Sequence, residues 1–332
     1  MAITNNSSFV PTMNLFLAHF TQCNAALAPG VLLIPMPDNT TLNKVQFDGV
    51  RNGLLAQQTV VQGRLNDQQI ARGDIDLQKV ALLVSINLFN EVLDAFYAQT
   101  KFIGARPRVP GFNDGPENFT RPLVDAMTLW EKINAAAAPA GVVLPLVLAN
   151  GTAHGSFASA ISTLQFAYLA EGDATQNVAL ARTDRNLLQE KAYTAMKSYR
   201  LAVPAKLALH PNLVETLPVL TPAPGHTPVP VNASALFQAP DEVKVVYGAS
   251  ADPDLLEYQL RGTVGDKYEE DDAIVIASHG PGDAREFMTA FGLTQPGATV
   301  ALKLYVVLTT GNESGSAAMV VRRPALAQPL AA

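Results

Sequence analysis

The chain has 332 residues and a formal net charge of −6, a length that allows two domains with separate hydrophobic cores. Residues 1–202 carry 15 basic and 15 acidic side chains, whereas residues 203–332 carry 8 and 14. Because neither half offers a basic face for phosphates, we expect no nucleic-acid partner.

The low content of charged residues is the second informative property. Charged residues make up 16% of the chain, against about 25% in typical soluble proteins. Such a chain often covers part of its surface with copies of itself or with a partner. The alternative is that Ser, Thr, Asn and Gln side chains hydrate the surface instead.

Targeting signals are not evident. No run of 18 apolar residues occurs, so we expect no membrane span. The first residues lack a basic segment followed by an apolar one, and we therefore expect no signal peptide. A cytoplasmic location is the default expectation, with non-classical export or surface display as alternatives.

Residues 1–202 have the apolar spacing of helices, and residues 1–9 are interpreted as an N-terminal arm. Helices are expected at 11–30, 39–61, 74–102, 116–138 and 156–201, the last with an interruption near Gly172. Residues 141–149 fit either an extended segment or a helix broken at Pro145. Short connections between long helices predict an antiparallel helical bundle.

The third of these expected helices carries a broad apolar stripe. The stripe consists of Leu77, Val80, Ala81, Val84, Leu88, Val92, Leu93, Phe96 and Tyr97. It is wider than a surface helix needs. We therefore expect this helix to be central in the bundle.

Residues 203–226 are interpreted as a proline-rich joint. Seven prolines fall between Pro204 and Pro230. Because proline restricts the backbone toward extended geometry, the joint is expected to hold the two halves at a preferred spacing. His226 stands between Pro224 and Pro228, where we expect it to fix the joint.

After Pro240 the apolar period changes from helical spacing to two, which indicates short strands. Strands are expected at 243–247, 256–260, 274–276, 287–291, 298–308 and 317–321. Many short strands at close spacing predict an antiparallel β-sandwich.

Residues 227–323 resemble a fibronectin type III domain. Residues 251–261 (ADPDLLEYQLR) are similar to that family's passage from the second to the third strand, 293–299 (LTQPGAT) to its Leu-x-Pro-Gly turn, and 312–316 (NESGS) to its last hairpin. Val300 stands where the family has a tyrosine, and Tyr247 where it has its core tryptophan. The resemblance implies a spacer or binding module of the kind found on extracellular bacterial proteins, with a protein or glycan as possible ligand. Residues 324–332 would be a C-terminal tail.

One acidic stretch is dense enough to be a metal-site candidate. It contains Asp266, Glu269, Glu270, Asp271 and Asp272. Calcium takes six to eight oxygen ligands, so the stretch is a weak calcium candidate. The alternating Asp-x-Asp-x-Asp-Gly order of a dedicated calcium loop is missing, which favours a solvated loop that keeps a sheet edge from pairing. We expect no cofactor.

Arg106, Arg108 and Phe112 are the interface candidates. They lie in a turn-rich loop between two expected helices. Because the strand half is acidic, we predict that this loop contacts an acidic edge of the same or a neighbouring subunit. A solvated loop is the alternative.

Three classes of function remain open. No catalytic constellation is present, so the leading prediction is a non-catalytic structural or assembly protein, in which the helical bundle self-associates into a homo-oligomer or larger assembly and displays the fibronectin-like module. The alternative is a binding or adhesion protein whose sandwich loops contact a glycan or a protein. The third is an enzyme of unfamiliar type in the helical half, which would need a polar pocket around Arg121, Asp125 and Arg185.

Overall fold

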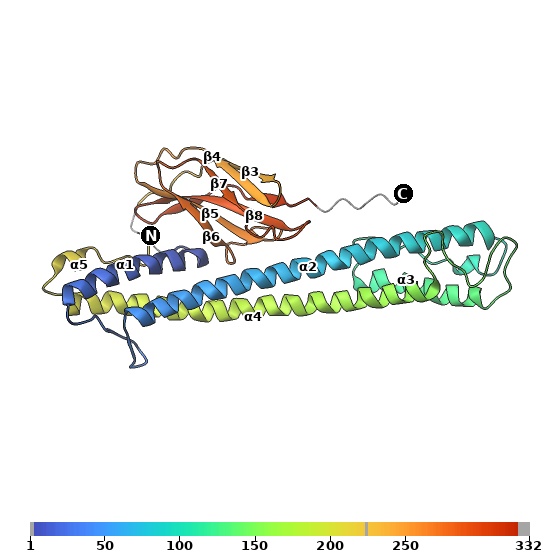
Figure 1. The fold of residues 1–332 in the computed structure, drawn as a ribbon, viewed down its shortest axis with the longest axis horizontal. Helices are drawn as coiled ribbons and strands as arrows, with labels where there is room; N and C mark the ends of the chain where they lie inside the picture. Colours follow the sequence, from blue (N-terminus) through green and yellow to red (C-terminus); the bar gives the residue numbers. More distant parts are fainter. Residues whose placement is uncertain (1–2, 223–224, 325–332) are drawn as a thin grey trace. The chain divides into compact units, whose positions relative to one another are not determined.

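The computed structural model describes residues 3–222 and 225–324 (Figure 1). The chain divides into two compact units, Met1–Asn66 together with Asn177–Ala332, and Asp67–Gln176. Helices α2 (Lys44–Phe96) and α4 (His154–Lys206) contribute residues to both units. The domain boundaries expected at residues 202 and 227 follow a different division and stay a prediction.

The helical half contains fewer and longer helices than the sequence predicts. The expected helices 39–61 and 74–102 form the single helix α2, and Gly172 does not interrupt α4. No proline occurs within α2, and an interior glycine such as Gly63 or Gly73 costs only about 1 kcal/mol relative to alanine. Buried residues of α2 before and after these glycines, such as Val61 and Ile75, therefore keep the helix continuous. Among the helices of the described residues, none combines the length and apolar character of a membrane span.

In the first unit, an aromatic cluster joins α1 (Phe9–Leu27), α2 and α4. The ring centroids of Phe16 and Phe20 lie 5.5 and 5.1 Å from that of Tyr199, and the Phe47 ring is 6.1 Å from it. Short elements complete this part: η1 (Asn6–Ser8), β1 (Ile34–Pro35), β2 (Thr41–Leu42) and α5 (Pro211–Glu215).

The proline-rich stretch is packed and partly helical. Its first residues form the last turn of α4, and α5 follows within it. Apolar residues between the prolines, Val203, Leu207, Leu213 and Leu220, are buried in the aromatic-centred core. The expectation of an extended spacer over this stretch is therefore wrong, because burial of these side chains determines its path.

The second half of the chain is an antiparallel β-sandwich, as predicted. Figure 1 shows its strands in orange to red. One sheet has the order β3 (Ala233–Gln238), β4 (Glu242–Tyr247), β7 (Glu286–Thr289); the other has the order β10 (Met319–Arg322), β8 (Thr299–Leu308), β5 (Leu255–Val264), β6 (Ile274–His279), with β9 (Glu313–Gly315) also paired to β8. Side chains from both sheets, including Val245, Phe287, Tyr258 and Leu304, fill the core between them.

Two strands were not predicted from the sequence. Strand β3 reads ASALFQ, and its side chains alternate between half-buried and exposed, so its apolar signal is weak. Strand β9 has three residues and pairs with Tyr305–Val307; it lies in the stretch 312–316, for which the sequence predicted a hairpin but no separate strand. Both strands therefore form because they pair with the strands beside them, β3 with β4 and β9 with β8, and their own residues show little strand preference.

The second unit is built from α2, α3 (Pro116–Asn134) and α4, with η2 (Ile103–Ala105) in the connection after α2. The Trp130 ring lies 5.1 Å from Phe89 and 5.7 Å from Phe157, and its Nε1 donates to Leu146 O at 3.3 Å. Residues 141–149 are not helical; Val147 forms an isolated bridge with Ala153. The extended alternative for this segment is therefore the better description.

Candidate functional site

The acidic stretch lies in the connection between β5 and β6, and its last member is buried. The Asp272 side chain is 2% exposed, yet its carboxylate contacts two guanidinium groups. Arg182 Nε lies 3.1 and 3.0 Å from the two carboxylate oxygens, and Arg185 Nη1 lies 2.9 Å from Oδ1. Because Arg182 and Arg185 are three residues apart on α4, both reach the same carboxylate. The hydrogen bond to Asp272 raises the pKa of Arg182.

The backbone of the same loop is held from both long helices. Arg185 Nη1 also donates to Asp271 O at 2.7 Å, and Gln62 Nε2 of α2 donates to Asp272 O at 2.6 Å. We call Gln62, Arg182, Arg185, Asp271 and Asp272 the clasp. The clasp binds the sandwich to α4 by hydrogen bonds between charged groups, which are stronger than bonds between neutral groups, and to α2 by the neutral bond from Gln62 to a backbone carbonyl.

Asn5 of the N-terminal arm binds the same region of the sandwich. Its Nδ2 donates to Glu270 Oε1 at 3.1 Å and to Glu313 Oε1 at 2.9 Å. Its Oδ1 accepts from the backbone N–H groups of Ser7 and Ser8, at 3.1 and 3.2 Å. Because carboxylates accept hydrogen bonds and backbone N–H groups donate them, Asn5 Nδ2 must face the two carboxylates and Asn5 Oδ1 must face the two N–H groups. One side chain therefore caps η1 and contacts the sandwich.

A second buried ion pair supports the carboxylates that Asn5 contacts. The side chain of Arg261 is fully buried; its Nη1 lies 2.9 Å from Glu313 Oε1, and its guanidinium stacks 4.0 Å from the Tyr305 ring. The Tyr305 hydroxyl donates to Glu270 at 2.6 Å. Burial raises the pKa of Tyr305, and the bond to Glu270 raises it further. Tyr305 therefore stays a protonated donor.

The acidic stretch is thus engaged by protein groups. Glu269 is 2.6 Å from Lys267 Nζ, Glu270 accepts from Tyr305, and Asp272 is paired with the arginines. A calcium ion would have to displace these partners. In residues 3–222 and 225–324, no three His, Cys, Asp or Glu side chains are grouped to hold a metal ion. The solvated-loop alternative is wrong for Asp272, which is buried.

The two arginines predicted at an interface have acidic partners in their own unit. Arg106 Nη2 lies 2.9 Å from Asp94 Oδ2, and Arg108 Nη2 lies 2.9 Å from Asp114 Oδ2. Two guanidinium groups that pair with the acidic stretch, those of Arg182 and Arg185, lie on α4. A contact of the loop with a neighbouring subunit stays a prediction.

Phe112 takes part in a lysine cage in this loop. Lys79 Nζ lies 5.6, 5.1 and 5.9 Å from the ring centroids of Phe112, Phe119 and Tyr168. It also donates to the carbonyls of Phe112 and Asp114, at 3.0 and 3.2 Å. The cage satisfies a largely buried ammonium group and fixes the loop to α2.

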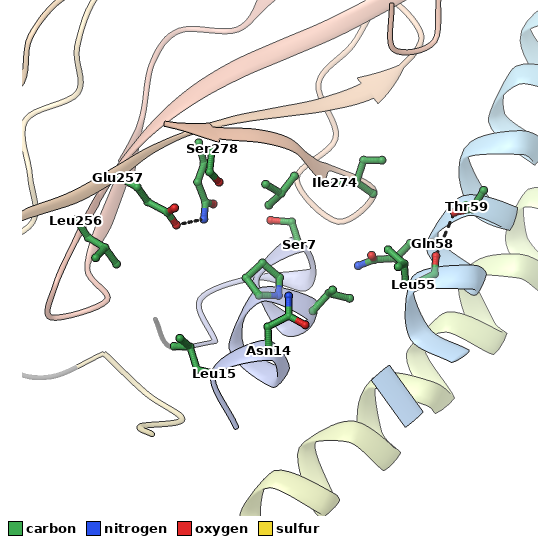
Figure 2. A pocket seen from close by; sticks show the side chains of 14 residues that line it. Ser7, Asn14, Leu15, Leu55, Gln58, Thr59, Leu256, Glu257, Ile274 and Ser278 are labelled. Atoms are coloured by element: carbon green, nitrogen blue, oxygen red, sulfur yellow. Dashed lines mark hydrogen bonds between the residues drawn. The ribbon is translucent and has the colours of Figure 1, made fainter. Parts of the chain in front are cut away.

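A cavity of about 520 Å³ is lined by α1, α2, β5 and β6 (Figure 2). Leu15, Leu55 and Leu256 contribute to its apolar wall and are 41%, 44% and 39% exposed. Glu257 is the only charged side chain among the described residues that line it. Its size is within the usual range for small-molecule sites.

A second cavity, of about 630 Å³, lies between α3 and α4 of the other unit. Arg121 and Asp125 line it, together with Tyr168 and Leu169. Arg185 is buried in the clasp. The three residues that the enzyme hypothesis needs around one pocket are therefore not brought together.

One face of α2 is left uncovered in the second unit. Ile70, Leu77, Val80 and Val84 are 42%, 64%, 53% and 49% exposed, and we call them the α2 stripe. They follow each other at intervals of seven, three and four residues, the spacing of a coiled-coil seam. The buried residues of this helix, such as Leu82, lie on its other side. The helix that was expected to be central is thus covered on one side only within its unit.

His226 fixes the stretch before the sandwich, as expected. Its Nε2 lies 2.6 Å from Asp252 Oδ1. This bond is the main reason why the pKa of Asp252 lies below its ordinary value.

Comparison with known proteins identifies no family for this chain. No protein-family model and no curated protein matches this chain. Among solved structures, a fibronectin type III-like protein from Clostridium thermocellum is 17% identical over 31% of this chain and 100% of its own, with a TM-score of 0.24. An fn3 domain of human contactin 1 is 15% identical over 34% of this chain and 88% of its own (TM-score 0.26). Pectate lyase PelI from Erwinia chrysanthemi is 15% identical over 28% of this chain and 28% of its own (TM-score 0.24).

The residues that bind the sandwich to the helices were missed by sequence reasoning. Arg182 was not singled out as a site residue, and Arg185 was considered as one only for a polar pocket in the helical half, whereas the structure buries Arg185 to 4% exposure against Asp272. Asn5 was placed in an arm without structure. The net charges of the two halves gave no signal for these partners, because the helical half is neutral and only the strand half carries an excess of one sign.

We predict that Asp272→Asn lowers the free energy of unfolding by about 3 kcal/mol, because it leaves the buried Arg185 without its counter-charge. Asp266→Asn is the matched control, since Asp266 is exposed in the same loop, and it should change stability by less than about 0.5 kcal/mol. Urea unfolding of both variants measures the difference. Equal effects would show that the clasp does not stabilise the fold.

We predict that Asn5→Asp lowers the free energy of unfolding by about 2 kcal/mol, because it keeps the helix cap and replaces a donor to two carboxylates by a third carboxylate. Asn5→Ser also keeps a cap but adds no charge, so its effect should be smaller. Thermal unfolding at neutral pH compares the two variants. A serine variant as destabilised as the aspartate variant would contradict the contact with Glu270 and Glu313.

The His226–Asp252 bond predicts a pH dependence in acid. A carboxyl whose pKa is lowered by folding contributes stability above its unfolded-state value, and this contribution disappears as pH falls through the folded-state value. The window therefore lies at and below the ordinary carboxyl pKa of 3.8. Asp252→Asn should flatten the stability curve there, whereas Asp254→Asn, an exposed neighbour, should not. Acid titrations of unfolding free energy test this, and parallel curves for the wild type and Asp252→Asn would refute it.

Proposed function

We propose that this chain is a non-catalytic structural protein whose helical part associates with further copies of itself and whose sandwich is carried as a fixed module. The α2 stripe is the observation that carries this proposal. Apolar side chains scattered singly on a surface need no explanation, but contiguous exposed patches mark interaction sites.

The surroundings of the stripe support a helical partner. Residues 80–90 of α2 contain no charged side chain on any face. A helix that is apolar around most of its circumference is normally covered on both sides. Within the second unit, only the side that faces α3 and α4 contributes to the hydrophobic core.

Charge favours a second copy as that partner. The 15 basic and 15 acidic residues of the helical half cancel, so two copies do not repel each other through this part. The same unit also exposes Phe166 and Leu169 of α4, which are 70% and 66% exposed. More than one apolar face is therefore available for assembly beyond a pair.

The clasp supports the second part of the proposal. A sandwich bound through the buried Asp272 and through Asn5 moves with α1, α2 and α4 instead of on a free tether. Each copy in an assembly would then carry its sandwich attached to α1 and to the parts of α2 and α4 that belong to the first unit. A binding or adhesion role of the sandwich is the second candidate, and the cavity that contains Glu257 favours it.

We predict that the wild-type chain has a mass in solution of at least twice 35.3 kDa, and that the double variant Leu77→Glu, Val80→Glu has a lower mass than the wild type, because burying four carboxylates at a two-copy seam is prohibitive. Light scattering on a size-exclusion column measures the mass, and circular dichroism checks helix content. The control is Leu236→Glu on β3, which makes the same change at a residue that is 70% exposed. A wild-type monomer at every concentration would refute self-association.

A further inference from the structure

The cavity in Figure 2 brings together apolar side chains from three separate elements. Leu15 comes from α1, Leu55 from α2 and Leu256 from β5, and each is only partly covered by the fold. A half-exposed leucine is unremarkable by itself. Three of them around one hollow of about 520 Å³ form a wall that an aliphatic or aromatic group would cover, as in small-molecule sites.

The polar part of the cavity has a fixed negative charge. Glu257 Oε1 accepts from Gln259 Nε2 at 2.7 Å. The Gln259 amide is oriented in turn, because its Oε1 accepts from Arg261 at 3.0 and 2.7 Å. Arg261 is itself paired with Glu313. The chain of bonds therefore positions the Glu257 carboxylate, while the positive charge behind it is already neutralised.

Glu257 consequently has no counter-charge among the described residues that line the cavity. Two neutral groups that can accept a hydrogen bond, the Asn14 amide and the Ser278 hydroxyl, line the same cavity. Ser278 lies directly opposite Gln259 across the β5–β6 pair. An ammonium group carries three donors and no acceptor, which matches such a set of oxygens.

We propose that this cavity binds a small amphiphilic amine, with its ammonium group at the Glu257 carboxylate and its apolar body against Leu15, Leu55 and Leu256. A carboxylate of the same shape would be repelled by Glu257. An uncharged analogue would keep the apolar contacts and lose the charge-assisted hydrogen bond. This site lies in the first unit and does not depend on self-association through the α2 stripe.

The test uses the full chain and three ligands of one chain length: octylamine, octanol and octanoate. Calorimetric titration at neutral pH should show saturable binding of octylamine, at least about tenfold tighter than octanol, the factor expected for one charge-assisted hydrogen bond. Octanoate should not bind. Glu257→Gln should reduce the preference for octylamine over octanol to about twofold or less.

Glu242→Gln is the matched control, because it removes an exposed carboxylate from β4 of the same sandwich and should leave octylamine affinity unchanged. Leu55→Gln should weaken octylamine and octanol together, which places the apolar body in the cavity. The proposal is overturned if octylamine does not saturate, if octanol or octanoate binds as tightly, or if Glu257→Gln keeps the preference. None of these outcomes depends on the mass of the assembly, so the binding proposal and the self-association proposal are tested independently.

Discussion

The buried carboxylate of Asp272 is the constraint on which the arrangement of the first unit depends. An isolated carboxylate out of water is very unfavourable, and a buried ion pair is tolerated only when its geometry is good and its remaining hydrogen bonds are satisfied. Here Arg182 and Arg185 supply the counter-charge, and Gln62 satisfies the neighbouring carbonyl. A shifted sandwich would leave Asp272 and Arg185 buried and unpaired, so the pair specifies one orientation as well as contributing to stability.

Other features of the unit follow from that orientation. The arm reaches Glu270 and Glu313 because the clasp brings the sandwich over η1, and Asn5 then couples the start of the helical part to the sheet. The cavity exists for the same reason, since its walls come from α1 and α2 on one side and from β5 and β6 on the other. The proline-rich stretch between the halves does not need to be a rigid spacer, because buried contacts on both sides of it perform that task.

The two halves use their charges differently. Two carboxylates of the strand half form buried ion pairs, Asp272 with Arg182 and Arg185, and Glu313 with Arg261. The helical half has no excess charge and leaves the α2 stripe uncovered. The clasp keeps the sandwich in a defined place on the parts of α2 and α4 that belong to the first unit.

The sequence by itself determined the class of each half, because the apolar period of 3.6 before the prolines and of two after them is a local property. It also determined most strands of the sandwich, where turn residues such as Pro296 and Gly297 mark the ends. Whether Gly63 interrupts a helix was not decided locally, since the small cost of glycine is offset by packing that only the fold supplies. The partners of the acidic stretch were decided by the tertiary structure alone: Arg182 and Asp272 are 90 residues apart, and no period or spacing links residues that meet only after both halves have folded.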